Sequence, residues 1–373
     1  MDINHTLAYL IYNMLVHLFL LTILIVLNLI PDRVVDRKRF ILPLSFLLIL
    51  LYWALRYDYG LDYWDYYSSF YDGTEGKLHR GFGERGYYAF SGLFNKFYQV
   101  IIAQSIIVMA SLFHLVRKYI PPQCYWLFFL LFFLTPRFHF VMISALRNSL
   151  SACVLFWAFD YCYIEKKRWI LFALLVFLAS LIHTTAIVFF LFPIYHLFSS
   201  RLKGKAVFIG LIVLDILSLF FVNALFQYVI SASSLTETYD SYLETIGESS
   251  IFGVMVKSIV LIPVFYFCTV FDKLKVHTKE RKIFLLAFFF LAIELFGFNF
   301  GGRFTLYLFI FFIISLTITY QYYKKERFFL LIPYLLLVLF TFYNYYIRLS
   351  TELFFNEGNY LFYHTIFEVS PLP

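Results

Sequence analysis

The feature that most constrains this chain is a series of long apolar runs separated by short basic loops. Hydrophobic residues make up 62% of the sequence and charged residues only 14%, which leaves few stretches polar enough for a water-exposed domain. Apolar runs of about 20 residues are long enough to cross the hydrocarbon core of a bilayer as helices. We therefore expect an all-α polytopic integral membrane protein with a single transmembrane domain over residues 1–373.

The basic residues predict the orientation of these helices. Cytoplasmic loops of membrane proteins are rich in Lys and Arg, so we assign the short loops that hold 20 of the 30 basic residues to the cytoplasm. Basic loops flank residues 169–198 on both sides, which requires two short crossings with an outer turn at His183. The first basic residue is Arg33, so the N-terminus is expected outside, and an even number of crossings puts the C-terminus outside as well. The expected crossings, about twelve in number, are 7–30, 40–55, 87–116, 123–135, 138–164, 169–182, 184–198, 207–230, 251–271, 283–300, 304–322 and 328–347.

Charge and motif patterns exclude several classes of function. The net charge of +7 does not indicate nucleic-acid binding, because the Lys and Arg residues lie in short loops rather than in one basic patch. The four cysteines show no CxxC or metal-ligand spacing, so we expect no metal site. The sequence also lacks P-loop, HExxH and GxSxG patterns, which argues against nucleotide hydrolysis and against a catalytic triad.

Arg147 and Arg303 are the most informative charges. Each lies in an apolar stretch near the predicted outer start of a helix, where free backbone N–H groups and the helix dipole favour an anion. A charge within a membrane helix is by default a candidate functional site. The alternative for Arg303 is an interface anchor, and for Arg147 a structural pairing with a carboxylate or a carbonyl. His183 lies at a third such start, with a turn histidine as its alternative role.

The first large external loop, residues 56–86, is acidic and aromatic. If its first half is helical, Asp58, Asp62, Asp65 and Asp72 lie on one stripe beside aromatic rings. Carboxylates accept hydrogen bonds from sugar hydroxyls, and aromatic rings cover apolar sugar faces; an amphipathic helix at the membrane surface is the alternative. Glu84 and Arg85 open the following span, and a carboxylate there is a candidate general base. A smaller external loop, 231–250, is expected to be solvated rather than to act as a substrate lid.

Short motifs in a fixed order give the chain a resemblance to a known family. The motifs are the run from Arg56 to Tyr67 (RYDYGLDYWDYY), Glu84-Arg85-Gly86-Tyr87, Arg147-Asn148-Ser149-Leu150, His183-Thr184 and Gly302-Arg303-Phe304. Each motif is short, but together they resemble the EpsG family of Wzy-type polysaccharide polymerases.

The resemblance implies a bacterial inner-membrane glycosyltransferase with a GT-C-like architecture. Such an enzyme joins oligosaccharide repeat units carried on undecaprenyl pyrophosphate at the periplasmic face, and so builds O antigen, capsule or exopolysaccharide. It implies no metal and no nucleotide-sugar cofactor. The implied partners are the lipid-linked oligosaccharides, membrane lipids, and a chain-length regulator and a flippase of the same pathway. A flippase for lipid-linked oligosaccharide and an O-antigen ligase are the alternatives.

The chemistry implied by the resemblance assigns roles to the candidate residues. A pyrophosphate leaving group needs positive charge, and we expect this from Arg147 and Arg303, with Arg56 and Arg85 as weaker candidates. A single base would suffice for an inverting transfer, and the candidates are Asp62, Glu84 and then His183. We expect sugar binding by Asp58, Asp65, Tyr63, Trp64 and Tyr66.

Overall fold

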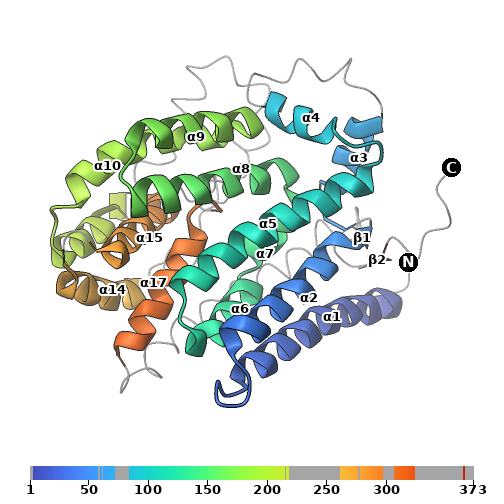
Figure 1. The fold of residues 1–373 in the computed structure, drawn as a ribbon, viewed down its shortest axis with the longest axis horizontal. Helices are drawn as coiled ribbons and strands as arrows, with labels where there is room; N and C mark the ends of the chain where they lie inside the picture. The colour runs from blue at the N-terminus through green and yellow to red at the C-terminus, as the bar shows by residue number, and fades with distance from the viewer. Residues whose placement is uncertain are drawn as a thin grey trace. The chain divides into compact units, whose positions relative to one another are not determined.

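The computed structural model is mostly helical, which confirms the expected all-α class (Figure 1). It describes residues 3–57, 59–60, 62–71, 84–214, 216–217, 261–275, 278–296, 306–323 and 364–365. The chain divides into two compact units, Met1–Phe190 with Val338–Pro373, and Leu191–Leu337.

The first unit is built around α5. This helix packs against α2 and α8, α8 packs against α9, and α1 packs against α6 (Figure 1). A short antiparallel pair, in which Arg56 lies opposite Thr365, joins β1 to β2. The elements are α1 (Ile3–Leu29), η1 (Arg37–Ile41), α2 (Leu42–Ala54), β1 (Arg56–Tyr57), α3 (Tyr63–Tyr71), α4 (Arg85–Ser91), α5 (Phe97–Tyr119), η3 (Pro122–Cys124), α6 (Tyr125–Leu134), α7 (Pro136–Ser144), α8 (Leu146–Trp157), η4 (Ala158–Glu165), α9 (Trp169–Ile182), η5 (Thr184–Leu191) and β2 (His364–Thr365).

Two of the predicted spans are interrupted. The span expected over 87–116 is divided into α4 and α5, and the span expected over 138–164 is broken at Ala145, whose φ of −83° and ψ of 79° are not helical. The single helix predicted over 138–164 is therefore wrong, whereas the polar residues of the span over 87–116, such as Gln99 and Gln104, already allow a break in it. The second break matters for the site, because it makes Arg147 the second residue of a new helix. In contrast, the predicted break at His183 is confirmed, since α9 ends at Ile182 and His183 has extended φ and ψ angles.

Proline explains where α5 ends. Ile120 precedes Pro121, and a residue before proline is disfavoured in the helical conformation. Ile120 accordingly has a φ of −99° and a ψ of 126°. The next helical segment restarts at Pro122, a position in the first turn where the missing N–H of proline costs nothing.

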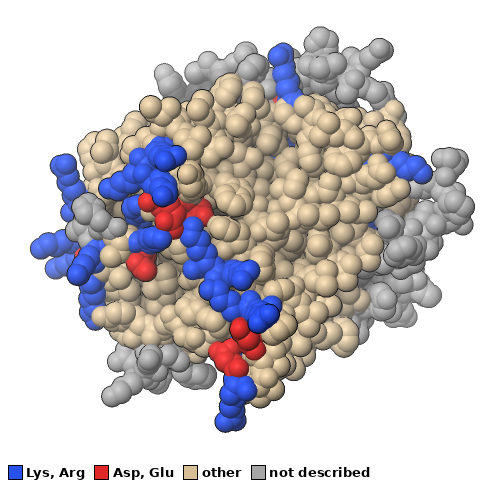
Figure 2. All heavy atoms as spheres, viewed as in Figure 1, with Lys and Arg blue, Asp and Glu red and all other residues tan. Residues whose placement is uncertain are grey.

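The lengths and surfaces of the helices indicate a membrane protein. Among the described residues, Phe97–Tyr119 is long and apolar enough to cross a bilayer, and Pro122–Phe133 with Phe138–Ser144 would add a second crossing if this pair, bent by 68°, is one span. The helix α9 is shorter but exposes Ile170, Leu174 and Leu178, spaced four residues apart on one face. Figure 2 shows a broad surface without charged side chains, with the visible charges gathered near helix ends. The expectation of about twelve spans remains a prediction.

In the second unit a buried arginine, Arg281, links the ends of several segments. Its described elements are α10 (Phe192–Ser199), a helix over Gly204–Leu214, α14 (Leu261–Lys273), α15 (Lys279–Phe296) and α17 (Phe309–Tyr322). Arg281 donates to the carbonyls of Phe271 at 2.9 Å and Leu202 at 3.1 Å, and it lies over the Phe271 ring. Because these carbonyls belong to separate segments, the guanidinium ties the start of α15 to the end of α14.

Candidate active site at the start of α8

Three segments that are distant in the sequence meet at Arg147. Arg147 belongs to the first turn of α8, Tyr66 comes from α3, and Glu84 immediately precedes α4. Ala145, at the N-cap position of α8, has no side chain able to accept a hydrogen bond from the first turn. The first turn of α8 is therefore a place where a group from elsewhere in the chain can accept a hydrogen bond.

Tyr66 supplies that group. The backbone N–H and the Nε–H of Arg147 both donate to the Tyr66 hydroxyl, at 3.4 and 3.2 Å. The guanidinium carbon also lies 5.2 Å from the centre of the Tyr66 ring, which is a favourable cation–π distance. Tyr66 thus does the work of an N-cap for α8 and at the same time holds the guanidinium in one orientation.

Glu84 is the acidic partner of Arg147. Arg147 Nη1 forms an ion pair with Glu84 Oε1, and the two side chains are 22% and 18% exposed. The second carboxylate oxygen, Oε2, is buried and has no hydrogen-bond partner within the described part of the chain. A charged pair that stays partly open to solvent, with one acceptor oxygen unused, is the kind of site that can take up a polar ligand.

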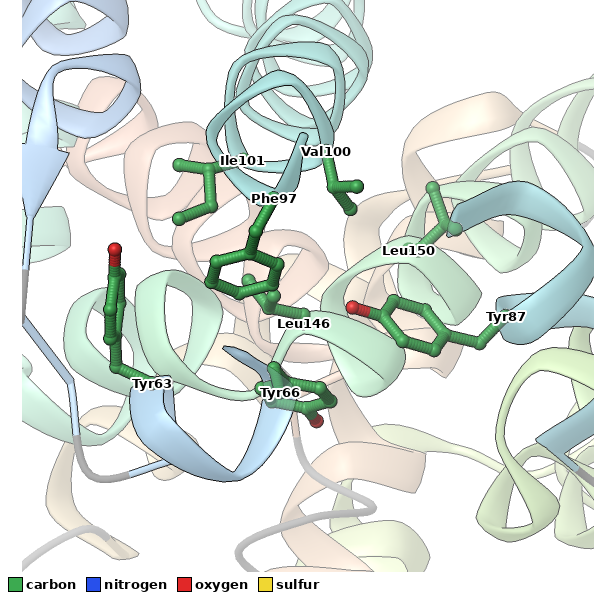
Figure 3. Close-up of a cluster of buried hydrophobic side chains, with 8 residues drawn as sticks. All are labelled: Tyr63, Tyr66, Tyr87, Phe97, Val100, Ile101, Leu146 and Leu150. Atoms are coloured by element: carbon green, nitrogen blue, oxygen red, sulfur yellow. The ribbon is translucent and has the colours of Figure 1, made fainter. Parts of the chain in front are cut away.

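The ion pair rests on an aromatic cluster. The Tyr66 and Tyr87 rings pack with their centres 5.4 Å apart, next to Leu146 and Leu150 of α8 (Figure 3). Burial raises the pKa of Tyr66, although the nearby Arg147 acts against this shift. The Tyr66 hydroxyl therefore stays protonated at neutral pH and serves as a neutral acceptor. The buried members of this cluster are Tyr63, Tyr66, Tyr87, Phe97, Val100, Ile101, Leu146 and Leu150.

The predicted sugar-binding loop is only partly helical. The helix α3 begins at Tyr63, so the stripe expected from Asp58 to Asp72 is wrong for Asp62, which lies in the turn before the helix. Asp58 and Asp72 lie outside the described residues. Gly60 makes this turn possible: its φ is +117°, and an added Cβ would lie 2.9 Å from the Cβ of Ser144.

The aromatic residues predicted to bind sugar differ in exposure. Tyr63 and Tyr66 are buried in the cluster, so their rings are covered by protein and do not present a face to a ligand. Trp64 and Asp65 are exposed on the other side of α3. Among the four predicted sugar-binding residues on α3, Trp64 and Asp65 are therefore the two with exposed side chains.

The predicted arginines also occupy different environments. Arg56 is buried, and its guanidinium donates to the carbonyls of Trp53 at 2.5 Å and Ile143 at 2.8 Å. Arg85, the first residue of α4, is exposed. Arg303 lies outside the described residues. The hydrogen bonds of Arg56 tie α2 to α7, so its pyrophosphate role stays the weaker prediction.

His183 lies at the end of the helix that touches α4. An added Cβ on Gly86 would come within 3.0 Å of the Leu181 carbonyl oxygen, so α4 lies directly against the last turn of α9. His183 follows that turn and is buried. The motif residues from 84 to 87 and His183 are therefore brought to the same end of the first unit, even though about 95 residues separate them.

A second buried polar cluster was not expected from the sequence. His17 Nε2 and the Tyr59 hydroxyl are 2.6 Å apart, and the Tyr52 hydroxyl lies 2.9 Å from the same nitrogen. His139 packs against these rings, with its centre 5.6 Å from that of His17. The cluster anchors the turn before α3 to α1 and α2. Nothing in the sequence marks His17 or His139, since single histidines in apolar helices carry no pattern.

The described residues contain no group of three or more His, Cys, Asp or Glu side chains that could hold a metal ion. Arg147 supplies a positive charge at this site.

Comparison with known protein families gives the same family that the ordered motifs suggested. A sequence model of the EpsG family matches residues 39–362, and the chain belongs to this family. The match includes α3, Glu84, Arg147 and His183, so all three segments of the site lie within it. No curated protein and no solved structure gives a significant match. Membership of this family indicates a role in polysaccharide biosynthesis.

Proposed function

We propose that this member of the EpsG family is a Wzy-type polysaccharide polymerase of the bacterial inner membrane. It transfers a growing oligosaccharide chain from undecaprenyl pyrophosphate to the non-reducing end of a new lipid-linked repeat unit at the periplasmic face. The product is O antigen, capsule or exopolysaccharide. The observation that carries the proposal is the Arg147–Glu84 pair, which joins an anion-binding group to a carboxylate in a partly exposed site.

Each half of the pair has a task in this reaction. The leaving pyrophosphate gains negative charge as the anomeric C–O bond breaks, and a fixed guanidinium stabilises that charge. A carboxylate next to it can accept the proton of the attacking hydroxyl. Glu84 is our first candidate for the base because it contacts Arg147 directly, and Asp62 and His183 remain the alternatives.

In its simplest form, the reaction needs only the guanidinium and the carboxylate. The acceptor hydroxyl loses its proton to the carboxylate, its oxygen bonds to the anomeric carbon, and the lipid pyrophosphate departs with the bonding electron pair. This single displacement inverts the anomeric configuration. Arg303 is proposed to bind the same pyrophosphate, and exposed Trp64 and Asp65 are proposed to contact sugar.

The proposal is tested by reconstitution. Full-length protein in liposomes, supplied with purified lipid-linked repeat units and no nucleotide, should give a ladder of polymer lengths on a gel. Arg147→Ala should reduce ladder formation by roughly 100-fold or more, the size of effect seen when one charge-stabilising group is removed. Lipid carriers with single repeat units should accumulate instead.

Three further variants test the roles assigned to Arg147 and to the candidate bases. Arg147→Lys keeps the charge but loses the Nε–H that donates to Tyr66, so partial activity is expected. Glu84→Gln and Asp62→Asn compare the candidate bases in the same assay. A full ladder from Arg147→Ala would contradict the proposal, and movement of unextended lipid-linked units across the bilayer would favour a flippase.

A further inference from the structure

The state of Glu84 in this site is unusual for a catalytic base. One carboxylate oxygen is held by Arg147, and the other is buried with no hydrogen-bond partner in the described part of the chain. Buried acceptors in proteins are normally paired, because leaving one unpaired costs the full desolvation of the group. The unused oxygen therefore points to a donor group that arrives with a ligand.

Arg147 is held in place independently of Glu84. Its Nε–H and backbone N–H donate to Tyr66, and its guanidinium lies over the Tyr66 ring. Nε donates to Tyr66 and Nη1 pairs with Glu84, so the contact with Glu84 uses one of the two terminal nitrogens. If Glu84 moved away, the guanidinium would keep its orientation and would present Nη1 and Nη2 together, the fork that binds two phosphate oxygens.

We infer that Glu84 is an internal stand-in for the pyrophosphate of the donor. In the free enzyme it neutralises Arg147, and when the donor pyrophosphate takes Arg147, the carboxylate is released to accept the proton of the acceptor hydroxyl. The inference rests on the proposed function and adds an order to it: donor first, acceptor activation second.

The exchange is favourable for electrostatic reasons. A pyrophosphate diester carries more negative charge and more acceptor oxygens than one carboxylate, so it is the stronger partner for a guanidinium. The existing pair is partly exposed to solvent, and ion pairs of that kind contribute little to stability. The proton balance is complete, since the acceptor O–H gives its proton to the freed carboxylate and the lipid pyrophosphate leaves with the electron pair of the broken C–O bond.

The experiment measures binding rather than turnover. Full-length wild-type protein and the Glu84→Gln variant are titrated in detergent with farnesyl pyrophosphate and, separately, with inorganic pyrophosphate by isothermal calorimetry. Glu84→Gln should bind farnesyl pyrophosphate roughly 5-fold tighter or more, because its internal competitor is gone. The same variant should form no ladder. A residue with a merely structural role would weaken both binding and activity.

Two control variants show whether the change in affinity is specific to Glu84. Arg147→Gln should abolish binding of both probes. Asp32→Asn removes a different carboxylate beside an arginine, 3.6 Å from Arg37 and in a predicted cytoplasmic loop, and should leave both affinities unchanged. If Glu84→Gln does not accumulate, Glu84→Asp replaces it, since its shorter side chain should weaken the ion pair and tighten binding to a smaller degree.

The outcomes separate the inference from the proposed function. Equal or weaker binding of farnesyl pyrophosphate by a folded Glu84 variant would overturn the stand-in role while leaving the polymerase proposal intact. Tightening toward inorganic pyrophosphate alone would also overturn it, because the site would then select the free anion and not the lipid donor. Wild-type protein that binds neither probe would count against the proposed function itself.

Discussion

At the scale of single residues, the arginines show that the surrounding residues determine which role an arginine can have. Arg56, Arg85 and Arg147 each belong to one of the short motifs on which the family resemblance rests. Arg56 is buried against backbone carbonyls, Arg85 is exposed, and Arg147 is paired with a carboxylate and a tyrosine. Arg147 combines a fixed position with an ionic partner, Glu84. The role of an arginine therefore follows from its acceptors, which come from other parts of the chain.

Tyr66 offers a test at this scale. Tyr66→Phe keeps the ring under the guanidinium but removes the acceptor for two N–H groups of Arg147. We expect the variant to be less stable by about 1 kcal/mol, as for loss of a helix cap or one buried hydrogen bond. Because the guanidinium then loses one of the contacts that orient it, the KM for donor should rise several-fold more than kcat falls, measured with reconstituted protein.

The neighbouring tyrosine provides the control. Tyr67→Phe removes a hydroxyl from the next position of α3, on a ring that packs against the edge of the same cluster. This variant should retain the wild-type KM. An unchanged KM in Tyr66→Phe would show that Tyr66 only stabilises the fold and does not position Arg147.

At the scale of elements, the π-helix η4 carries a second charged cluster. Asp160 is buried and accepts hydrogen bonds from Lys118 at 2.7 Å and from Tyr119, and it contacts His114 at 2.8 Å. Since α8 and η4 form one helical stretch, this cluster lies more than 15 Å along the helix from Arg147 at a rise of about 1.5 Å per residue. The cluster ties the end of α5 to η4.

Asp160→Asn tests this connection. The substitution keeps the volume but removes the charge that pairs with Lys118, and we expect a loss of about 2–3 kcal/mol in unfolding free energy, because the aspartate is buried while the lysine is partly exposed. Thermal unfolding in detergent would measure the change. Glu280→Gln, on an exposed position of α15, is the control and should leave the melting temperature unaltered. A wild-type melting temperature for Asp160→Asn would show that the cluster does not stabilise the α5–η4 contact.

At the scale of the whole molecule, the ends of α8–η4 predict the topology. Arg147 opens this helical stretch and Lys166 follows it, a separation of nearly 30 Å at about 1.5 Å per residue, which matches the thickness of a bilayer core. The basic residues after η4 belong to a predicted cytoplasmic loop. The Arg147 site is therefore expected at the periplasmic end.

Cysteine labelling tests this arrangement. The four native cysteines are buried thiols, and they can be replaced to give a background without reactive thiols. Arg85→Cys should then react with a membrane-impermeant maleimide added outside spheroplasts. Lys166→Cys should react only after the membrane is permeabilised. Reaction of both positions from the same side would contradict the predicted orientation.

The sequence predicted more of the fold than of the site. The apolar runs predicted helices, and the break at His183 followed from basic loops on both sides of one run. The break at Ala145 was missed, because the residues around it contain neither Gly nor Pro to mark it. Arg147, Glu84 and Tyr66 were all named as candidates, but in separate roles, and Tyr66 was predicted to bind sugar although its ring is buried.

By itself, the sequence determined that this chain is helical, apolar and a member of the EpsG family, because periodicity, composition and motif order are properties of the chain as written. Only the tertiary structure decided that Glu84 pairs with Arg147 and that Tyr66 caps α8. These contacts join positions about 60 to 80 residues apart, and no local rule relates residues at that separation. They form because α3, α4 and α8 pack around one aromatic cluster, which brings the anion-binding arginine and the carboxylate together.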